Sequence, residues 1–181
     1  MERTVGFKTL PQAIDDAVYM SQRWPLVVDP EGKAASFLRY NSRIVNAMFA
    51  DEVSPGNLRK ALVNTLKSGT WLTFNFDVFE GDLSSFFSSD FPETVLSVKE
   101  VMKDEFLRSL ARPEELKVGK DDLVPRAGFK LIVVSKREEQ TAWMKEHFML
   151  LKIDHAVVES ERKDHLEFKF AKLPEEERIR K

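Results

Sequence analysis

Short apolar segments alternate with helix-like segments along the chain, and this alternation limits the folds open to it. The strongest strand prediction is FKLIVVS at residues 129–135, a continuous apolar run suited to burial on both faces. Further strands are predicted at residues 26–29, 44–49 and 70–77, with a weaker one at 156–159. Such strands, separated by helices, indicate a mainly parallel sheet with helices on both faces. We therefore predict a three-layer α/β fold.

One predicted helix is marked at both ends. Ser54 can cap its first turn, Pro55 suits the first helical position, and Gly69 ends it. Between these residues, leucine and alanine recur at the spacing of one helical face, which predicts a stripe packed on the sheet. Further helices are predicted at residues 9–21 and 33–40.

The length of 181 residues suits one domain of ordinary size. We predict a helical lead-in at residues 1–22, an AAA+-like α/β domain at 23–160 and a charged C-terminal tail at 161–181. Within the domain, residues 112–128 form a polar connector rich in Pro and Gly, and residues 137–148 predict a helix.

Charge and composition narrow the classes of partner. The formal net charge is −2, so no basic footprint for nucleic acid stands out. The absence of cysteine excludes disulfides and thiolate metal sites and fits a reducing compartment. No apolar run approaches the roughly 18–20 residues that cross a bilayer, and the first residues contain no signal-peptide core. We predict an intracellular protein with protein partners, and neither nucleic acid nor a membrane as a partner.

Four of the 14 phenylalanines crowd into the segment FEGDLSSFFSSDF. Phe79, Phe86, Phe87 and Phe91 either fill a core beneath a loop or form a partner-binding surface, because contiguous exposed aromatics usually mark contacts. We expect the core.

The segment LVVDPEGKAAS has the layout of a phosphate-binding loop: a strand, a Gly-Lys turn and a helix. In parallel sheets the binding crevice lies beyond the carboxyl ends of the strands, where this turn would stand. A working loop reads G-x-x-x-x-G-K-[ST], with inward backbone N–H groups, a lysine on the phosphates and a hydroxyl on Mg²⁺. Aligning Gly32 and Lys33 with this motif places Val27 at the first glycine and Ala34 at the hydroxyl.

The loop also carries charge of the wrong sign for a triphosphate. Asp29 and Glu31 add two carboxylates, each of which would repel a phosphate charge about 4 Å away by roughly 4 kcal/mol at an effective dielectric of 20. Pro30 removes one N–H donor. We predict weak nucleotide binding at most, with Lys33 exposed to solvent in the first turn of the helix.

A metal-binding and hydrolytic carboxylate pair should follow the third predicted strand, WLTFNFDV. Depending on the alignment, that pair becomes Asn75-Phe76 or Asp77-Val78, and neither supplies a base beside a metal ligand. The three histidines have no H-E-x-x-H spacing, and no G-x-S-x-G segment is present. We therefore predict no catalytic residue and no protein-bound metal.

Three segments resemble consecutive blocks of the fifth AAA+ unit of the dynein heavy chain. They are WPLVVDPEGKAASFLRY, NLRKALVNTLKSGTWLTFNF and AGFKLIVVSK, and together the similarity covers roughly residues 22–160. The resemblance implies a P-loop-type α/β fold in a unit that serves structure rather than ATP turnover in dynein. It also places Ser135 at the polar sensor position and suggests a cytoplasmic or cytoskeleton-associated protein. Similar modules would fit the C-terminal part of an IQ-motif and ankyrin-repeat-containing protein, although neither repeat is present here.

The sequence departs from that family at the positions that matter for nucleotide binding. The family's Gln-rich turn is Glu31-Gly32-Lys33 here, and its Glu-Asn pair after the third strand is Asn75-Phe76. Residues 82–128 match poorly, and the chain contains none of the stalk, linker or other ring units of a motor.

We therefore expect a non-catalytic P-loop-like structural or protein-interaction module without a required cofactor. One alternative is a nucleotide-binding domain with weak or no NTPase activity that holds ATP or ADP on Gly32-Lys33 and Mg²⁺ on Asp77. Another is a small-molecule phosphotransferase with residues 112–128 as a lid. The vestigial nucleotide-binding candidates are Asp29, Gly32, Lys33, Asn75, Asp77 and Ser135.

Overall fold

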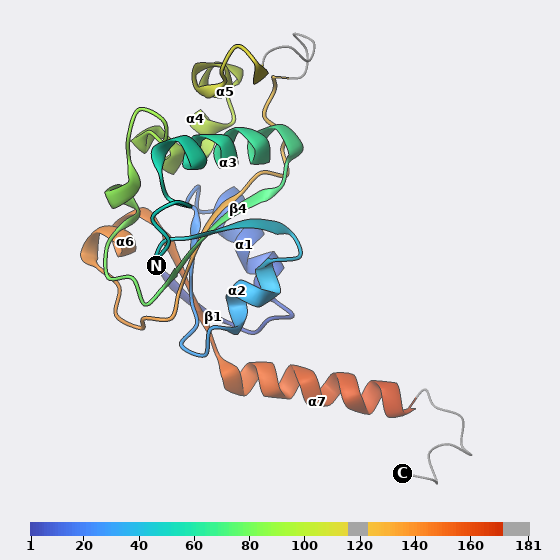
Figure 1. Ribbon diagram of the computed structural model, residues 1–181. Coiled ribbons are helices and arrows are strands. Elements are labelled where there is room, and N and C mark those ends of the chain that lie inside the picture. The colour runs from blue at the N-terminus through green and yellow to red at the C-terminus, as the bar shows by residue number, and fades with distance from the viewer. Residues whose placement is uncertain (116–122, 172–181) are drawn as a thin grey trace.

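In the computed structural model, the described residues, 1–115 and 123–171, form an α/β fold around one parallel sheet of six strands (Figure 1). The strand order is β1-β6-β2-β5-β4-β3, and all neighbouring strands are parallel. The strands are β1 (Glu2–Val5), β2 (Pro25–Val28), β3 (Ser42–Asn46), β4 (Trp71–Asp77), β5 (Leu131–Ser135) and β6 (Met149–Ile153). The predicted parallel sheet flanked by helices is confirmed. Residues 116–122 of the predicted connector and lid, and residues 172–181 of the predicted tail, lie outside the described residues.

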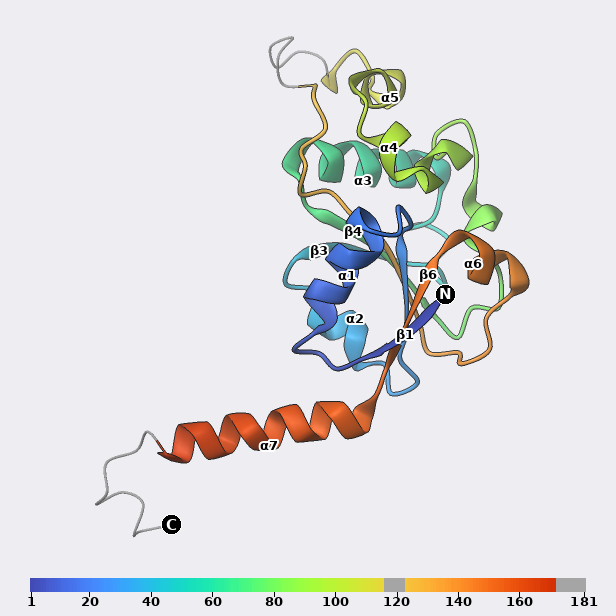
Figure 2. The same cartoon turned by 180° about the vertical axis from the view of Figure 1, so that it is seen from behind.

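Helices cover both faces of the sheet (Figures 1 and 2). The first face carries α3 (Pro55–Ser68), two 3₁₀ turns, and α4, α5 and α6, while the second carries α1 (Leu10–Tyr19) and α2 (Lys33–Leu38). The smaller elements of the first face are η1 (Leu83–Phe86), η2 (Glu93–Leu96), α4 (Val98–Val101), α5 (Asp104–Leu110) and α6 (Ala142–His147). The last helix, α7 (His155–Ala171), projects from the body in both views.

β5 shows why the most apolar segment of the sequence became a central strand. All five of its residues are buried. Alternate side chains point to opposite faces, so Val133 packs in the core under α3, whereas Ile132 and Val134 pack under α1 and α2. Burial on two faces requires an apolar residue at every position, which is the pattern that predicted this strand.

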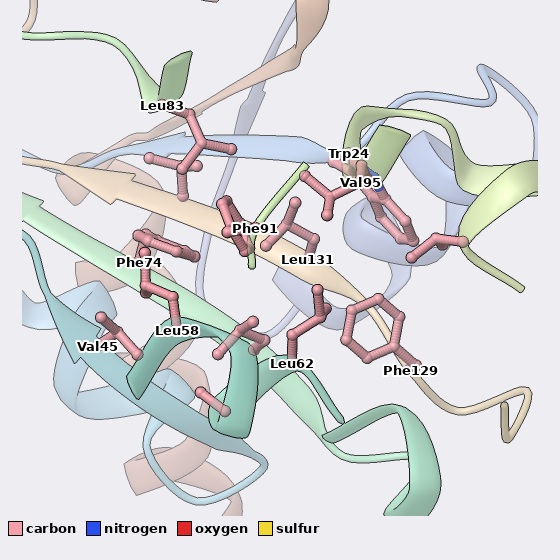
Figure 3. Close-up of a cluster of buried hydrophobic side chains, with 14 of the residues drawn as sticks. Trp24, Val45, Leu58, Leu62, Phe74, Leu83, Phe91, Val95, Phe129 and Leu131 are labelled. Atoms are coloured by element: carbon pink, nitrogen blue, oxygen red, sulfur yellow. Dashed lines mark hydrogen bonds between the residues drawn. The ribbon is translucent and has the colours of Figure 1, made fainter. Parts of the chain in front are cut away.

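The larger core lies between α3 and the sheet (Figure 3). Leu58 and Leu62 of α3 lie beside Phe74 of β4 and Leu131 of β5, and all four are fully buried. The indole N–H of Trp24 donates a 2.7 Å hydrogen bond to the carbonyl of Val95, which secures η2 over the start of β2. This core uses the apolar stripe predicted for α3. The predicted Ser54 cap is not formed, because the Ser54 hydroxyl donates instead to the carbonyl of Asp51 at 2.9 Å.

The crowded phenylalanines belong to the same core, as expected. Phe91 is completely buried and its ring centroid lies 5.4 Å from that of Phe74. Phe79, Phe86 and Phe87 are partly buried and pack against the same cluster. The segment after β4 therefore covers the first face of the sheet with aromatic rings.

Two strand assignments differ from the sequence prediction. The strand predicted at residues 156–159 is wrong, because these residues lie in α7; the last strand is β6 (Met149–Ile153). The apolar residues of β6 directly follow the predicted helix at 137–148, and a short apolar run does not distinguish a strand from the end of a helix. β1 was not predicted, since Val5 is its one buried residue and pairing with β6 forms the strand.

Removal of the Phe74 ring should test the core under α3. Phe74→Ala should lower the free energy of unfolding by about 3–5 kcal/mol, because a fully buried ring would leave a cavity. Phe49 is 58% exposed, so Phe49→Ala should change the free energy of unfolding by no more than about 0.5 kcal/mol. Urea unfolding measures both, and equal losses would contradict this placement of the core.

A buried ion pair joins α3 to the segment that follows α5. Arg59 donates from Nη1 to Oε2 of Glu115 at 2.7 Å and from Nη2 to Oε1 at 3.2 Å, and Nη1 also donates to the carbonyl of Leu110 at 3.1 Å. The Arg59 side chain is 3% exposed and that of Glu115 is 21% exposed. The hydrogen bond from Arg59 lowers the pKa of Glu115 below its ordinary value of 4.5, against the opposing effect of burial.

The contribution of this pair to stability should depend on pH. A carboxyl group whose pKa is lower in the folded chain stabilises the fold above its unfolded pKa, and that stability is lost as the pH falls through the folded pKa. Glu115→Gln should therefore lower the free energy of unfolding by about 2–3 kcal/mol at neutral pH, with the difference from wild type shrinking in acid. Urea unfolding over a pH series tests this, and a pH-independent difference would exclude the ionic contribution.

Candidate functional site

Three of the predicted positions meet at the carboxyl ends of β2, β5 and β4. The backbone N–H of Asp29 donates to the carbonyl of Ser135 at 2.8 Å. Asp77 pairs in register with Ser135, and the N–H of Lys136 donates to the carbonyl of Asp77 at 2.9 Å. The turns after the three strands therefore form one surface, at the edge of the sheet where a crevice was expected.

Asp29 points into its own loop. Its side chain is completely buried, Oδ2 accepts from the N–H of Ala34 at 2.6 Å, and Oδ1 accepts from the N–H of Glu31 at 3.1 Å. A phosphate loop directs its N–H groups at the bound anion, but two of them here bind the protein's own carboxylate. Asp29 thus closes the turn and begins α2.

His155 completes the environment of Asp29 from a distant part of the sequence. It is the first residue of α7, and its Nε2 lies 2.8 Å from Oδ1 of Asp29. Its Nδ1 lies 3.2 Å from Oε2 of Glu31. The imidazole therefore bridges two loop carboxylates and joins α7 to the loop. No local sequence spacing predicts this contact, because the two residues are 126 positions apart.

The lysine of the Gly-Lys turn pairs within the loop. Lys33 is exposed, and its Nζ lies 2.5 Å from Oε2 of Glu31. The hydrogen bond with Glu31, followed by the negative charge of that carboxylate, raises the pKa of Lys33 above its ordinary value. Lys33 is a first-turn residue of α2 whose charge is matched by its neighbour.

Lys136 is the cation that covers the turn, and it is not among the predicted site residues. A Cβ added to Gly32 would lie 2.3 Å from Cε of Lys136, so the lysine stem rests on the glycine. Gly32 also has φ +72°, in the left-handed region that favours glycine. The Lys136 Nζ continues to Asp77, lying 2.8 Å from its Oδ1.

Asn75 and Ser135 hold the neighbouring turns. Asn75 donates from Nδ2 to Oδ1 of Asn46 at 3.0 Å, and its own Oδ1 accepts from the N–H of Asp77 at 3.3 Å. The Ser135 hydroxyl accepts from the N–H of Arg137 at 3.1 Å, and Gln140 donates to it at 3.0 Å. Both side chains are thus hydrogen-bonded to residues of the same edge.

Within residues 1–115 and 123–171, no group of three or more His, Asp or Glu side chains is arranged to hold a metal ion. In the same residues, no helix is both long enough and apolar enough to cross a membrane. No protein-family model matches the chain.

The buried Asp29 carboxylate should matter far more for stability than the partly exposed side chain of Asp77. Asp29→Asn should lower the free energy of unfolding by about 2–3 kcal/mol, because three donors lose a charged acceptor. The Asp77–Lys136 pair is about two-fifths exposed, so the matched Asp77→Asn should lose less than about 1 kcal/mol. Urea unfolding measures both.

A double-mutant cycle with His155→Ala isolates the contact between the imidazole and Asp29. The combined loss should be smaller than the sum of the single losses, because either change breaks the same hydrogen bond. Strict additivity would show that His155 and Asp29 do not stabilise each other.

Proposed function

We propose that this chain is a non-catalytic P-loop-like module, similar to the fifth AAA+ unit of the dynein heavy chain, with a structural or protein-interaction role. One observation carries the proposal: the groups that such a loop offers to a nucleotide are engaged within the protein. The loop N–H groups bind Asp29, Lys33 pairs with Glu31, and Asp77 pairs with Lys136.

The order of the strands supports the P-loop interpretation. β2, which leads into the Gly-Lys turn, lies between β6 and β5, and β5 lies between β2 and β4. Ser135 therefore follows β5, the strand beside β2, and Asp77 follows β4, the strand beyond β5, where a sensor and a metal ligand would be useful. The order differs from those of the dinucleotide-binding and flavodoxin-like folds.

Electrostatics supports the non-catalytic part of the proposal. A phosphate entering the turn would meet the Asp29 and Glu31 carboxylates and would have to displace the Lys136 stem from Gly32. It would also break the ion pair of Lys136 with Asp77. Phosphate binding would thus break existing contacts before it formed new ones. The contact between Asp29 and His155 already orders the loop without a ligand.

A thermal-shift titration with MgATP, MgADP and MgGTP tests the proposal. A ligand at 100 times its Kd stabilises a protein by about 2.7 kcal/mol, which is a shift of several degrees for a domain of this size. We expect no shift at millimolar nucleotide in the wild type, in Lys33→Ala or in the exposed control Lys60→Ala. Lys136→Ala opens the space over Gly32 and tests whether the lysine stem alone excludes nucleotide.

A shift that disappears in Lys33→Ala but persists in Lys60→Ala would contradict the proposal. It would establish instead a nucleotide-binding domain that uses Gly32-Lys33. Phosphate transfer to a member of a nucleoside and small-metabolite panel would establish the phosphotransferase alternative.

A further inference from the structure

A second surface lies at the opposite ends of the strands from the Gly-Lys turn. The connection from α2 to β3 and the connection from α3 to β4 border a depression of about 800 Å³. Its lining consists of residues 39–43 and 69–71. The depression adjoins β3, which pairs with β4 alone among the residues that the structure describes.

The lining of this depression is positively charged. Arg39 and Arg43 are exposed, and the lining contains no acidic side chain among the described residues. Within those residues, neither arginine forms an ion pair with a carboxylate. This differs from the Gly-Lys turn, where Lys33 and Lys136 are both paired. The two guanidinium groups are therefore available to an external anion, which they can bind bidentately.

Two aromatic side chains share the depression. Tyr40 is 91% exposed, and Trp71 forms part of the wall. Trp71 is held from behind by Lys130, whose Nζ lies 5.0 Å from a ring centroid of the indole and 2.8 Å from Oδ1 of Asp15. Tyrosine, tryptophan and arginine are the residues most enriched at energetic centres of protein interfaces. A wall that is already fixed also loses little entropy on binding.

The outer edge of β3 offers backbone groups beside this depression. Trp71 N–H donates to the carbonyl of Asn41, and Ala47 N–H donates to the carbonyl of Asn75. In a parallel pair of strands, every second residue directs its backbone N–H and C=O groups at the same neighbouring strand. Asn41 and Ala47 bond to β4, so Arg43 and Val45 between them also direct their backbone groups at β4. The N–H and C=O of Ile44 therefore point away from β4. A strand edge with free N–H and C=O groups can accept an extended peptide.

The open part of this edge is short. The outward N–H of Asn46 already donates to Oε2 of Glu52 at 2.7 Å, and its carbonyl accepts from Phe49 at 3.1 Å. The turn after β3 therefore covers the carboxyl end of the edge. What stays open is the stretch at Ser42 and Ile44, next to Arg39 and Arg43.

We propose that this depression and the open edge of β3 bind an extended acidic segment of a partner protein. Carboxylates of the segment would pair with Arg39 and Arg43, and its backbone would pair with Ile44. The proposal rests on the interaction role proposed above and names the chemistry of the partner.

A peptide fits these features better than a nucleic acid. The outward N–H and C=O of Ile44 match a peptide backbone, which has both groups, whereas a sugar–phosphate chain lacks that pattern. Binding of single strands also depends on a long positive groove, and the formal net charge of the chain is −2.

Fluorescence anisotropy with three labelled probes tests the proposal. The probes are a short peptide of alternating valine and glutamate, the matching valine–lysine peptide, and a short oligothymidine. The glutamate peptide should bind at least about tenfold more tightly than the other two, because charge-assisted hydrogen bonds supply that difference. Equal binding of both peptides, no binding of the glutamate peptide, or preferential binding of oligothymidine would overturn the proposal.

Variants locate the binding surface. The double variant Arg39→Glu with Arg43→Glu should weaken glutamate-peptide binding at least about tenfold. Arg108→Glu, at an exposed position of α5, should leave glutamate-peptide binding unchanged. Ile44→Pro removes an outward N–H without removing a bond to β4, so it should weaken binding while a melting curve confirms folding. Equal effects of the Arg39/Arg43 and Arg108 changes would overturn the proposal.

Amide exchange of the wild-type protein supplies a measurement that does not depend on the folding of Ile44→Pro. The glutamate peptide should slow exchange of the Ile44 N–H, and unchanged exchange at saturating peptide would exclude pairing at this edge. If the glutamate peptide does not bind, the outcome of the nucleotide titration is unaffected. A nucleotide shift would establish the nucleotide-binding alternative without affecting peptide binding.

Discussion

The buried carboxylate of Asp29 is the interaction on which the Gly-Lys turn depends. A charge without solvent contact is tolerated when hydrogen bonds surround it, and Asp29 receives them from Glu31, Ala34 and His155. These contacts join the end of β2, the start of α2 and the start of α7. One side chain thus determines how the loop closes and where the last helix leaves the body of the protein.

The same contacts underlie the proposal of a P-loop-like turn that does not bind phosphate. The turn has β2 before it, Gly32 in the left-handed region and α2 after it. The N–H groups that would bind phosphate are occupied by Asp29, and the Lys136 stem lies over the glycine. In contrast, Arg39 and Arg43 at the other end of the sheet face a depression without an acidic lining residue among those described. The paired charges of the turn and the two arginines of the depression therefore support the proposed role in binding a partner protein.

Sequence patterns predicted the parts of the fold whose burial is locally periodic. All five residues of β5 are buried because both of its faces are covered, and α3 has one apolar stripe and ends at left-handed Gly69. β1 gave no signal, since one of its four residues is buried and its partner strand lies at the far end of the chain. β6 was missed because its apolar run directly follows a short helix, and periodicity cannot separate the two in so few residues.

The sequence by itself determined the parallel α/β class, the candidate positions beyond the strand ends, and the mismatch of Val27 and Ala34 with the glycine and the hydroxyl of the phosphate-loop motif. The tertiary structure decided what the remaining groups do: it brought His155 to Asp29, and Lys136 to Gly32 and Asp77. It also left the outer side of β3 without a partner strand among the described residues. The physical reason is the distance along the chain over which each signal acts. Residue type and spacing report local conformation and burial. The pairing of charges that are distant in sequence depends on how the sheet aligns the ends of its strands.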